Sequence, residues 1–570
     1  MRARERRHGV DDLLRATQVS GFALRAGGVA AVAAGVAASV LAVALAGGGS
    51  GDGAQVVPGL DEAGRLTGWG LPAVRLALDG LAVLTVGAVL AAAVLIPLDG
   101  GRLAPAAARH LRAAAWLSSG WALAAAATLA LTLSDVLGEP LGRVLTTGSV
   151  LQQIRDLPQG NALALVVALT LALAVLTWTR RTPGGALGAL ALAGVALLPP
   201  PLTGHSAAAT NHGAAVTSLA LHVVGVAFWV GGLVVLVAHA ARRGPRIEVM
   251  CERFGRMAPW CFLAVGLSGV ANLATRTPSV ADLVAGDYGR LAIAKGVAFA
   301  VLGWFGWWHR RHTLPAVAAG SVYGFARLAT VETVVMAAAM GLAVALSRTA
   351  PSEAAVEEGA VQALLGQAPL AEPTLGRLAT LWRFDLFFAV LVVVLAGLYV
   401  AGVARSRSWP KSRVLAWYAS LLVVVVATQS GVARYAFEET GALVVQQALL
   451  TGLASSLLVA GAPIRLALDV VRPARIDGDR GPREWLLLLV RARGAGRAVG
   501  AGLLVTGSLL LYLTPLGDGL RRGELRHLAV NLAFLAAGVL LFQKRVSAAA
   551  GGSDRPRSRV PAAGSVSPRR

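Results

Sequence analysis

Long apolar runs separated by short polar segments dominate this chain of 570 residues. A run of roughly 18 to 25 apolar residues is long enough to cross ~30 Å of hydrocarbon as a helix. About fourteen runs meet this criterion: residues 22–46, 73–97, 111–134, 161–178, 185–201, 214–241, 257–275, 290–308, 327–347, 384–404, 413–430, 440–461, 497–515 and 525–543. We therefore predict an all-α, polytopic integral membrane protein. The first run has the length of a retained anchor, although cleavage as a signal peptide would leave the other spans unchanged.

Basic residues fall mainly in every second connecting segment, as the positive-inside rule requires of cytoplasmic loops. The densest clusters are Arg242, Arg243 and Arg246, followed later in the chain by Arg472, Arg475, Arg480 and Arg483. Both clusters lie inside when the amino terminus is placed in the cytoplasm. This alternation predicts that both termini are cytoplasmic.

Composition supports a membrane protein and excludes several other classes. Hydrophobic residues make up 56% and charged residues 14% of the chain. The net charge of +22 comes from basic residues scattered between apolar runs, so we expect membrane lipids and no nucleic acid as partners. The chain has three lysines and no G-x-x-x-x-G-K-[ST] motif, so we expect no ATP-driven step and no catalysis. The two cysteines, ten residues apart, form no C-x-x-C motif.

The acidic segment 348–382, predicted to lie on the outer side, divides the chain into two modules. Residues 1–347 form a module of about nine helices, and residues 383–546 form a module of about five. The tail 547–570 is rich in Gly, Ser, Pro and Arg. Such a composition cannot bury enough apolar surface to fold, so we predict that the tail is disordered.

Ionisable side chains inside the apolar runs are the first candidates for function, because each costs several kcal/mol in hydrocarbon unless it is paired. Asp79, His222 and Lys295 come from three different spans and share a depth in the outer half of the membrane. Alternatively, Asp79 pairs with Arg75 one turn away and Lys295 extends outward to water. A fourth ionisable residue, Glu332, lies nearer the inner side.

Three histidines within eighteen residues suggest a metal site. His205 and His212 occur in a short outer loop without charged residues, and His222 follows inside the next span. Trp229 lies seven residues further along the same helical face. Neutral imidazole suits copper and zinc. A histidine within a helix also commonly hydrogen-bonds to a neighbouring helix, and that reading stays open.

Methionines extend the possible metal path. Glu332, Met336 and Met340 recur every four residues on one predicted helix. Thioether sulfur is a soft donor for Cu(I), although methionine also serves as ordinary packing. His222 and Met340 at similar depth would supply mixed nitrogen and sulfur donors, which favours copper. A haem held by two histidines is an alternative, but His222 and His239 lie at different depths on one span.

Four segments resemble the copper resistance protein D (CopD) family of membrane proteins. They are LALHVVGVAFWVGGL (219–233), RFGRMAPWCFLAVGLSGVANL (253–273), YGRLAIAKGVAFAVLGWFGWWHRRH (288–312) and FARLATVETVVMAAAMGLAVALSRTAPS (325–352). The resemblance implies copper handling at a bacterial cytoplasmic membrane. It carries over His222, Trp229, Lys295 and Glu332 as positions of the family motifs.

The second module resembles the CtaG family of cytochrome c oxidase assembly factors, through the segments 381–403, 408–421 and 446–468. That family typically has a His-x-x-x-His pair where this chain has Leu443 and Gln447. Further along, His527 is present, but Asn531 and Ala533 replace expected histidines. We therefore interpret the second module as shortened and without its metal site, acting as a structural or partner-docking half.

Together these observations predict a protein of the bacterial cytoplasmic membrane that takes up or relays copper, for copper homeostasis or oxidase maturation. The expected copper ligands are His222 as principal ligand, His205 and His212 as capture residues, and Met336 and Met340 as soft donors. Asp79, Lys295 and Glu332 would tune charge or couple protons. A periplasmic copper chaperone or an oxidase subunit is the expected partner. The alternatives are a non-transporting scaffold for oxidase assembly and a b-type haem electron carrier.

Overall fold

The structure is a computed structural model of the chain. It describes residues 64–146, 154, 157–203, 212–274, 280–285, 287–318, 323–348, 371–383, 385–474, 479, 481–491, 496–513 and 524–543. Within these ranges the regular elements are helices, with no strand longer than the isolated bridge between Asp99 and Arg102. The predicted all-α class is therefore confirmed.

Contacts divide the chain into two compact units. Unit 1 contains the described residues up to Arg377, together with Arg383–Leu391 and Pro473–Gly481. Unit 2 contains Leu378–Trp382, Val392–Arg472 and the described residues from Pro482 onward.

The helices described for unit 1 are given in chain order. They are α2 (Gly64–Leu90), η1 (Ala91–Leu95), α3 (Pro105–Leu137), α4 (Leu141–Thr146), α6 (Pro158–Thr179), α7 (Pro183–Ala196), α8 (Pro199–Thr203), α9 (His212–Ala241), α10 (Ile247–Ala274), α11 (Val280–Ala285), α12 (Asp287–Trp308), η3 (His309–Thr313), α13 (Leu314–Ala318) and α14 (Tyr323–Arg348). Proline in the first turn starts α3, α6 and α7, where a missing N–H costs nothing. The elements η1 and η3 are π-helical turns, which often mark functional sites.

The later part of the chain forms shorter helices. They are α16 (Leu375–Thr380), α17 (Leu386–Arg405), α18 (Lys411–Gln429), α19 (Gly431–Tyr435), α20 (Thr440–Ala448), η4 (Leu449–Ala454), α21 (Ser455–Ala460), α22 (Pro463–Val470), α23 (Pro482–Arg491), α24 (Gly496–Leu513) and α26 (Glu524–Phe542). In unit 2, Tyr399 of α17 stacks on Trp417 of α18, with ring centroids 4.6 Å apart. The Tyr399 hydroxyl also donates to the carbonyl of Gly461 (2.8 Å).

Within the described residues, eleven helices are long and apolar enough to cross a membrane. They match the predicted runs from 73–97 through 440–461. The runs 497–515 and 525–543 correspond to the shorter apolar helices Ala498–Tyr512 and His527–Phe542. The run 22–46 and the tail 547–570 lie outside the described residues, so fourteen spans, cytoplasmic termini and a disordered tail stay predictions. The chain is a multi-pass membrane protein.

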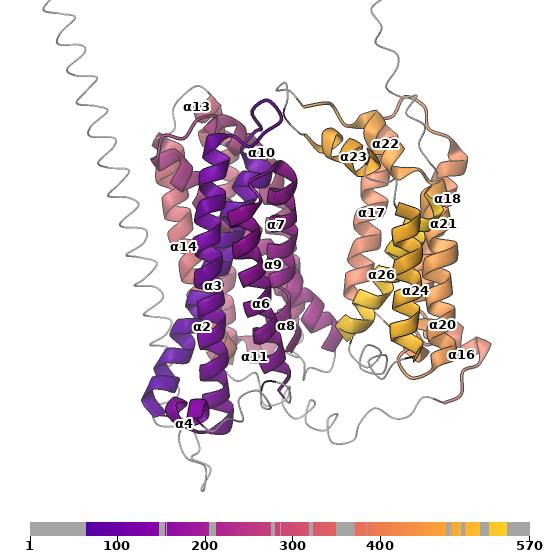
Figure 1. Cartoon of the computed structure of the whole chain (residues 1–570), viewed down its shortest axis with the longest axis horizontal. Helices are drawn as coiled ribbons and strands as arrows, with labels where there is room; N and C mark the ends of the chain where they lie inside the picture. The colour runs from indigo at the N-terminus through magenta and orange to yellow at the C-terminus, as the bar shows by residue number, and fades with distance from the viewer. Residues whose placement is uncertain are drawn as a thin grey trace, which may run out of the picture. The chain divides into compact units, whose positions relative to one another are not determined.

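Small residues allow the helices of unit 1 to pack closely, as expected in a membrane. Helix α2 lies beside α3, which lies beside α6 (Figure 1), and α9 contacts α2, α10 and α14. A Cβ atom added to Gly87 of α2 would lie only 2.2 Å from the carbonyl oxygen of Gly231 of α9. These two glycines therefore permit direct backbone contact between α2 and α9, and this contact fixes the helix that carries His222.

Candidate functional site

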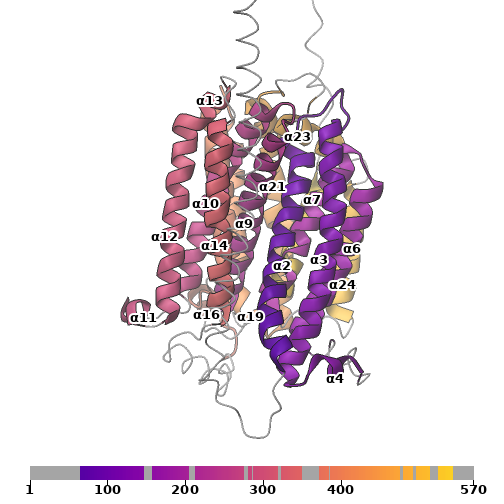
Figure 2. The ribbon, with the colours of Figure 1, turned by 90° about the vertical axis from the view of Figure 1, so that its left-hand side faces the viewer.

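A polar cluster joins α9 and α10 near the first turns of α9 and the last turns of α10. It consists of Ser218, His222, Ser268 and Asn272, with Lys295 of α12 acting electrostatically on His222. Figure 2 shows α9, α10, α12 and α14 in the same part of unit 1. We call this group the α9–α10 cluster. It lies at the end of the spans that the sequence places near the outer surface.

His222 is held in one orientation by a chain of hydrogen bonds. The Ser268 hydroxyl donates to the carbonyl of Val265 (3.0 Å), and His222 Nδ1 lies 3.1 Å from the same hydroxyl oxygen. Because the hydroxyl proton is already used, the oxygen accepts from Nδ1–H of the imidazole. The lone pair of the neutral ring is then on Nε2, the atom left to coordinate a cation. Ligating histidines commonly donate their other N–H to a polar neighbour in this way.

Ser218 and Asn272 form a second hydrogen bond between α9 and α10, one turn closer to the start of α9 and the end of α10. The Asn272 amide donates to the Ser218 hydroxyl (3.5 Å). Ser218 and His222 are four residues apart on α9, and Ser268 and Asn272 are four apart on α10, so each pair shares one helix face. Sequence reasoning missed Ser218, Ser268 and Asn272, although polar residues spaced by four in otherwise apolar runs are a detectable signal.

The alternative raised from the sequence, an interaction of Asp79 with Arg75, agrees with the structure. Asp79 is exposed on the surface of α2, and Arg75 one turn earlier acts on its carboxylate. Asp79 and His222 lie at a similar depth, measured from the contact of Gly87 with Gly231. Asp79 precedes that crossing by eight residues and His222 by nine, so both lie about 12–14 Å from it. His222, however, faces α10.

Glu332 of α14 meets a histidine that the sequence analysis did not select. Its carboxylate oxygen Oε2 lies 3.1 Å from Nε2 of His309, the first residue of η3. The two side chains are 3% and 10% exposed, so the pair is buried. His309 Nδ1 also lies 2.6 Å from the Thr313 hydroxyl. A buried carboxylate–imidazole pair can exchange a proton without moving the backbone.

The two methionines of α14 are part of the apolar core of unit 1. Met336 is buried, and Met340 is half-buried against the same core. Trp229 is buried in this core, where its ring meets Phe262 of α10 edge to face at a centroid distance of 5.3 Å. Phe262 in turn stacks on Phe299 of α12 (4.1 Å). This aromatic group packs α9, α10 and α12 together below His222.

Two of the predicted capture residues lie beyond what the structure describes. His205 falls in the gap between α8 and α9, and His212 begins α9 but its side chain is outside the described atoms. Among the described residues, no three histidine, cysteine or carboxylate side chains converge as a metal site would require. The described donor set at the α9–α10 cluster is thus one imidazole with hydroxyl and amide oxygens.

A histidine pair forms at the opposite end of α9. His239 Nε2 donates to the carbonyl of Pro245 (3.1 Å), so its Nδ1 accepts from His110 Nε2 of α3 (3.4 Å). A second helix therefore supplies a partner for His239, which the sequence could not show. The two rings bond directly to each other, and this contact satisfies both as a buried polar pair.

In the second module, the positions of the expected histidines do meet. Gln447 of α20 donates from its amide to Asn531 of α26 (2.8 Å), and both side chains are buried. Leu443 is buried beside them in an apolar cluster with Leu511 and Phe534. An amide hydrogen bond and a leucine thus occupy the place where the family resemblance puts ligating histidines.

Family models match three successive parts of the chain. Residues 66–217 match the copper resistance protein D-like N-terminal domain, and residues 248–346 match copper resistance protein D. Residues 397–563 match the cytochrome c oxidase caa3 assembly factor (Caa3_CtaG). The copper resistance protein D family is linked to copper resistance and transport, and the Caa3_CtaG family to cytochrome c oxidase assembly.

Curated relatives come from mycobacteria. An uncharacterized protein of Mycobacterium bovis and one of Mycobacterium tuberculosis are each 35% identical over 179 residues, and one of Mycobacterium leprae is 32% identical over 178 residues. Each match covers 30% of this chain and 27% of the relative, so the chain spans about a quarter of the length of these relatives. No solved structure matches the chain. The chain thus contains, in order, two segments that match copper resistance protein D-type families and one that matches the Caa3_CtaG family.

Proposed function

We propose that this protein takes up copper from the outer face of a bacterial cytoplasmic membrane, with His222 as the first ligand inside the membrane. Copper is the cargo in this scheme. The observation that carries the proposal is the contact of His222 Nδ1 with the Ser268 hydroxyl (3.1 Å), which engages one ring nitrogen and leaves Nε2 as the proposed metal ligand. A neutral imidazole held by a polar neighbour is the usual form of a ligating histidine.

The remaining proposed ligands are two histidines that precede His222 in the sequence and two methionines of α14. His212 begins α9, ten residues or about 15 Å before His222. We assign His205 and His212 to capture of copper before it reaches His222. Met336 and Met340 on α14, a helix that contacts α9, serve as soft donors further along the route.

Two ionisable sites, Lys295 and the Glu332–His309 pair, change their proton occupancy as copper passes. A copper ion at His222 is repelled by the ammonium of Lys295, which acts on the same imidazole. Loss of a proton from Lys295 removes this repulsion, and lysine is the basic residue that can release one. The buried Glu332–His309 pair accepts and passes a proton nearer the other end of unit 1. Asp79 on α2 tunes the local charge through its interaction with Arg75.

The second module acts as a docking half for a cytochrome oxidase subunit or a periplasmic copper chaperone. Its support is the match to the assembly-factor family together with the Gln447–Asn531 bond at the positions of the expected ligands. In this scheme the module binds no copper, and the chain catalyses no reaction.

The test is copper accumulation in bacterial cells whose own copper uptake has been removed. We expect His222→Ala to reduce cellular copper, measured by inductively coupled plasma mass spectrometry, to the level of cells without the protein. Ser268→Ala should give an intermediate value, because the ring keeps its nitrogen but loses its orientation. Immunoblots of the membrane fraction establish that each variant is inserted.

His312→Ala is the matched control, since His312 is an exposed histidine of unit 1 that stacks on Trp308. This variant should accumulate copper like the wild type. Normal accumulation in His222→Ala cells refutes the proposed route. If oxidase activity falls while copper uptake stays normal, the scaffold function replaces the transport function.

A further inference from the structure

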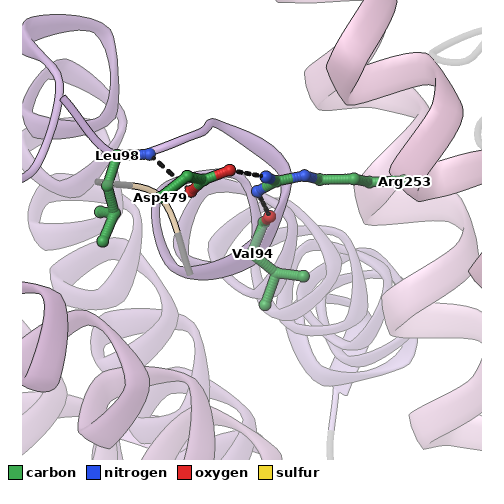
Figure 3. Close-up of polar contacts among 4 residues, drawn as sticks. All are labelled: Val94, Leu98, Arg253 and Asp479. Carbon is green, nitrogen blue, oxygen red and sulfur yellow. Dashed lines mark hydrogen bonds and ion pairs between the residues drawn. The ribbon is translucent and has the colours of Figure 1, made fainter. Parts of the chain in front are cut away.

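A short segment of the chain belongs to unit 1 although its neighbours in sequence do not. Pro473–Gly481 connects α22 to α23, and it falls within the part of the sequence that the assembly-factor family model matches. Its contacts nevertheless place it in unit 1. Asp479 is the residue of this segment that makes the described polar contacts (Figure 3).

Both carboxylate oxygens of Asp479 are used. Oδ2 pairs with the guanidinium of Arg253 from the second turn of α10, and Oδ1 accepts from the backbone N–H of Leu98 (3.0 Å). A second guanidinium nitrogen of Arg253 donates to the carbonyl of Val94 in η1 (2.7 Å). Figure 3 shows the four residues converging on one point. The Asp479 side chain is only 2% exposed.

The partners of Asp479 are also held by contacts that do not involve its carboxylate. The π-helical turn η1 ends at Leu95, and Ile96 is extended, so the backbone N–H of Leu98 has no helical partner. Leu98 is itself buried, so that N–H requires an acceptor. The bond to Val94 directs the planar guanidinium of Arg253 toward the same place. One cation and one buried N–H group thus present the geometry that a carboxylate satisfies.

We propose that the turn Val94–Leu98 and Arg253 form a carboxylate-docking site on unit 1, and that its occupant is Asp479 of this chain's own segment Pro473–Gly481. The segment from the assembly-factor part of the sequence is therefore an integral piece of the copper-resistance part. Removing the carboxylate leaves a guanidinium and a buried N–H group without their acceptor, which is costly for both.

The docking site can be tested by hydrogen–deuterium exchange of the full-length chain in detergent, followed by mass spectrometry of peptides. In Asp479→Ala, we expect the peptide containing Leu98 to exchange at least about tenfold faster than in the wild type, because its N–H loses the acceptor. The segment Pro473–Gly481 should lose protection at the same time. Exchange in α18, which makes none of these contacts, should not change.

Glu252→Ala is the matched control. Glu252 lies on α10 next to Arg253, but its ion pair with Arg256 (2.5 Å) is exposed to the surface. It should leave the Leu98 peptide unchanged. Asp479→Asn decides the question if the alanine variant does not insert. It has nearly the same size but cannot pair with Arg253 as an ion, so the segment Pro473–Gly481 should again exchange faster. Wild-type exchange of both peptides in the inserted variant overturns the proposal.

Discussion

Replacing Gly87 with alanine tests the crossing of α2 and α9 that positions His222. The added Cβ would lie 2.2 Å from the carbonyl oxygen of Gly231 and 2.8 Å from its Cα atom, whereas ordinary contact begins at 3.4 Å. The first distance is about 1.2 Å too short. The atoms it meets are backbone, so no side-chain rotation can relieve the overlap. The two helices must therefore separate by about an ångström.

We expect this separation to cost about 1–3 kcal/mol, the range observed when an atom is forced into a well-packed interior. A loss of 1 kcal/mol lowers the Tm of a domain of 150–250 residues by roughly 2–4 °C. The assay is thermal unfolding of the purified protein in detergent. Size-exclusion chromatography after heating measures the fraction that stays folded. Copper accumulation should fall as well, because the shift moves α9 and with it the α9–α10 cluster.

Gly80→Ala is the matched control on the same helix, since a Cβ at Gly80 would meet no atom within 4 Å. Alanine there should leave the protein equally stable or more stable, by about 0.5–1 kcal/mol, because glycine is the poorer helix former. If Gly87→Ala unfolds at the same temperature as Gly80→Ala, the backbone contact of α2 with α9 is not present in the protein.

Three further predictions concern other parts of the molecule. Glu332→Gln should stop copper uptake but lower the Tm by no more than a few degrees. The amide keeps a polar contact with His309 but carries no exchangeable carboxyl proton. Copper uptake at the wild-type level would remove Glu332 from the route. The triple variant Leu443→His, Gln447→His and Asn531→His places histidines at the expected ligand positions of unit 2. It should bind about one extra copper or zinc ion per chain. Metal analysis of the purified protein, with Gln447→Ala as the control, measures this gain. Burial raises the pKa of Asp385, which precedes α17, although its hydrogen bond from the Phe388 N–H (3.1 Å) acts in the opposite direction. A raised pKa in the folded state means that the folded chain holds this proton more tightly than the unfolded chain, so stability falls as the pH rises through that pKa. In thermal scans at several pH values, the Tm of Asp385→Asn relative to the wild type should therefore increase toward neutral pH. A Tm difference that does not change with pH would contradict the assignment.

Hydropathy alone predicts most of the fold, because in a membrane each span must be apolar along its whole length. It cannot predict the π-helical turns, since η3 differs from an α-helix only by one hydrogen-bond register. Nor does it reveal the crossing at Gly87 and Gly231, because the chain holds 67 glycines and the spacing does not distinguish those at contacts. The distinction appears only when two backbones meet.

The candidate site was partly accessible from the sequence. Depth along the spans selects His222 and Lys295, whose ammonium acts on the imidazole, but it also selects Asp79, which is exposed and interacts with Arg75. Depth fixes only the position along a helix, whereas rotation about the helix axis depends on neighbours. The partner of Glu332 escaped for a related reason, since His309 lies beside Arg310 and Arg311 and reads as part of a basic inner loop.

The pairing of Arg253 with Asp479 has a consequence for how the chain is made. The two residues are separated by 226 positions, so at about 5–20 residues per second a ribosome needs roughly 11–45 s to synthesise the carboxylate after the arginine. In the topology predicted from the positive-inside rule, Arg253 is during that interval one of the charges that retain the start of α10 in the cytoplasm. In that topology the same guanidinium first takes part in membrane insertion and later pairs with Asp479, which is possible only after translation has passed residue 479.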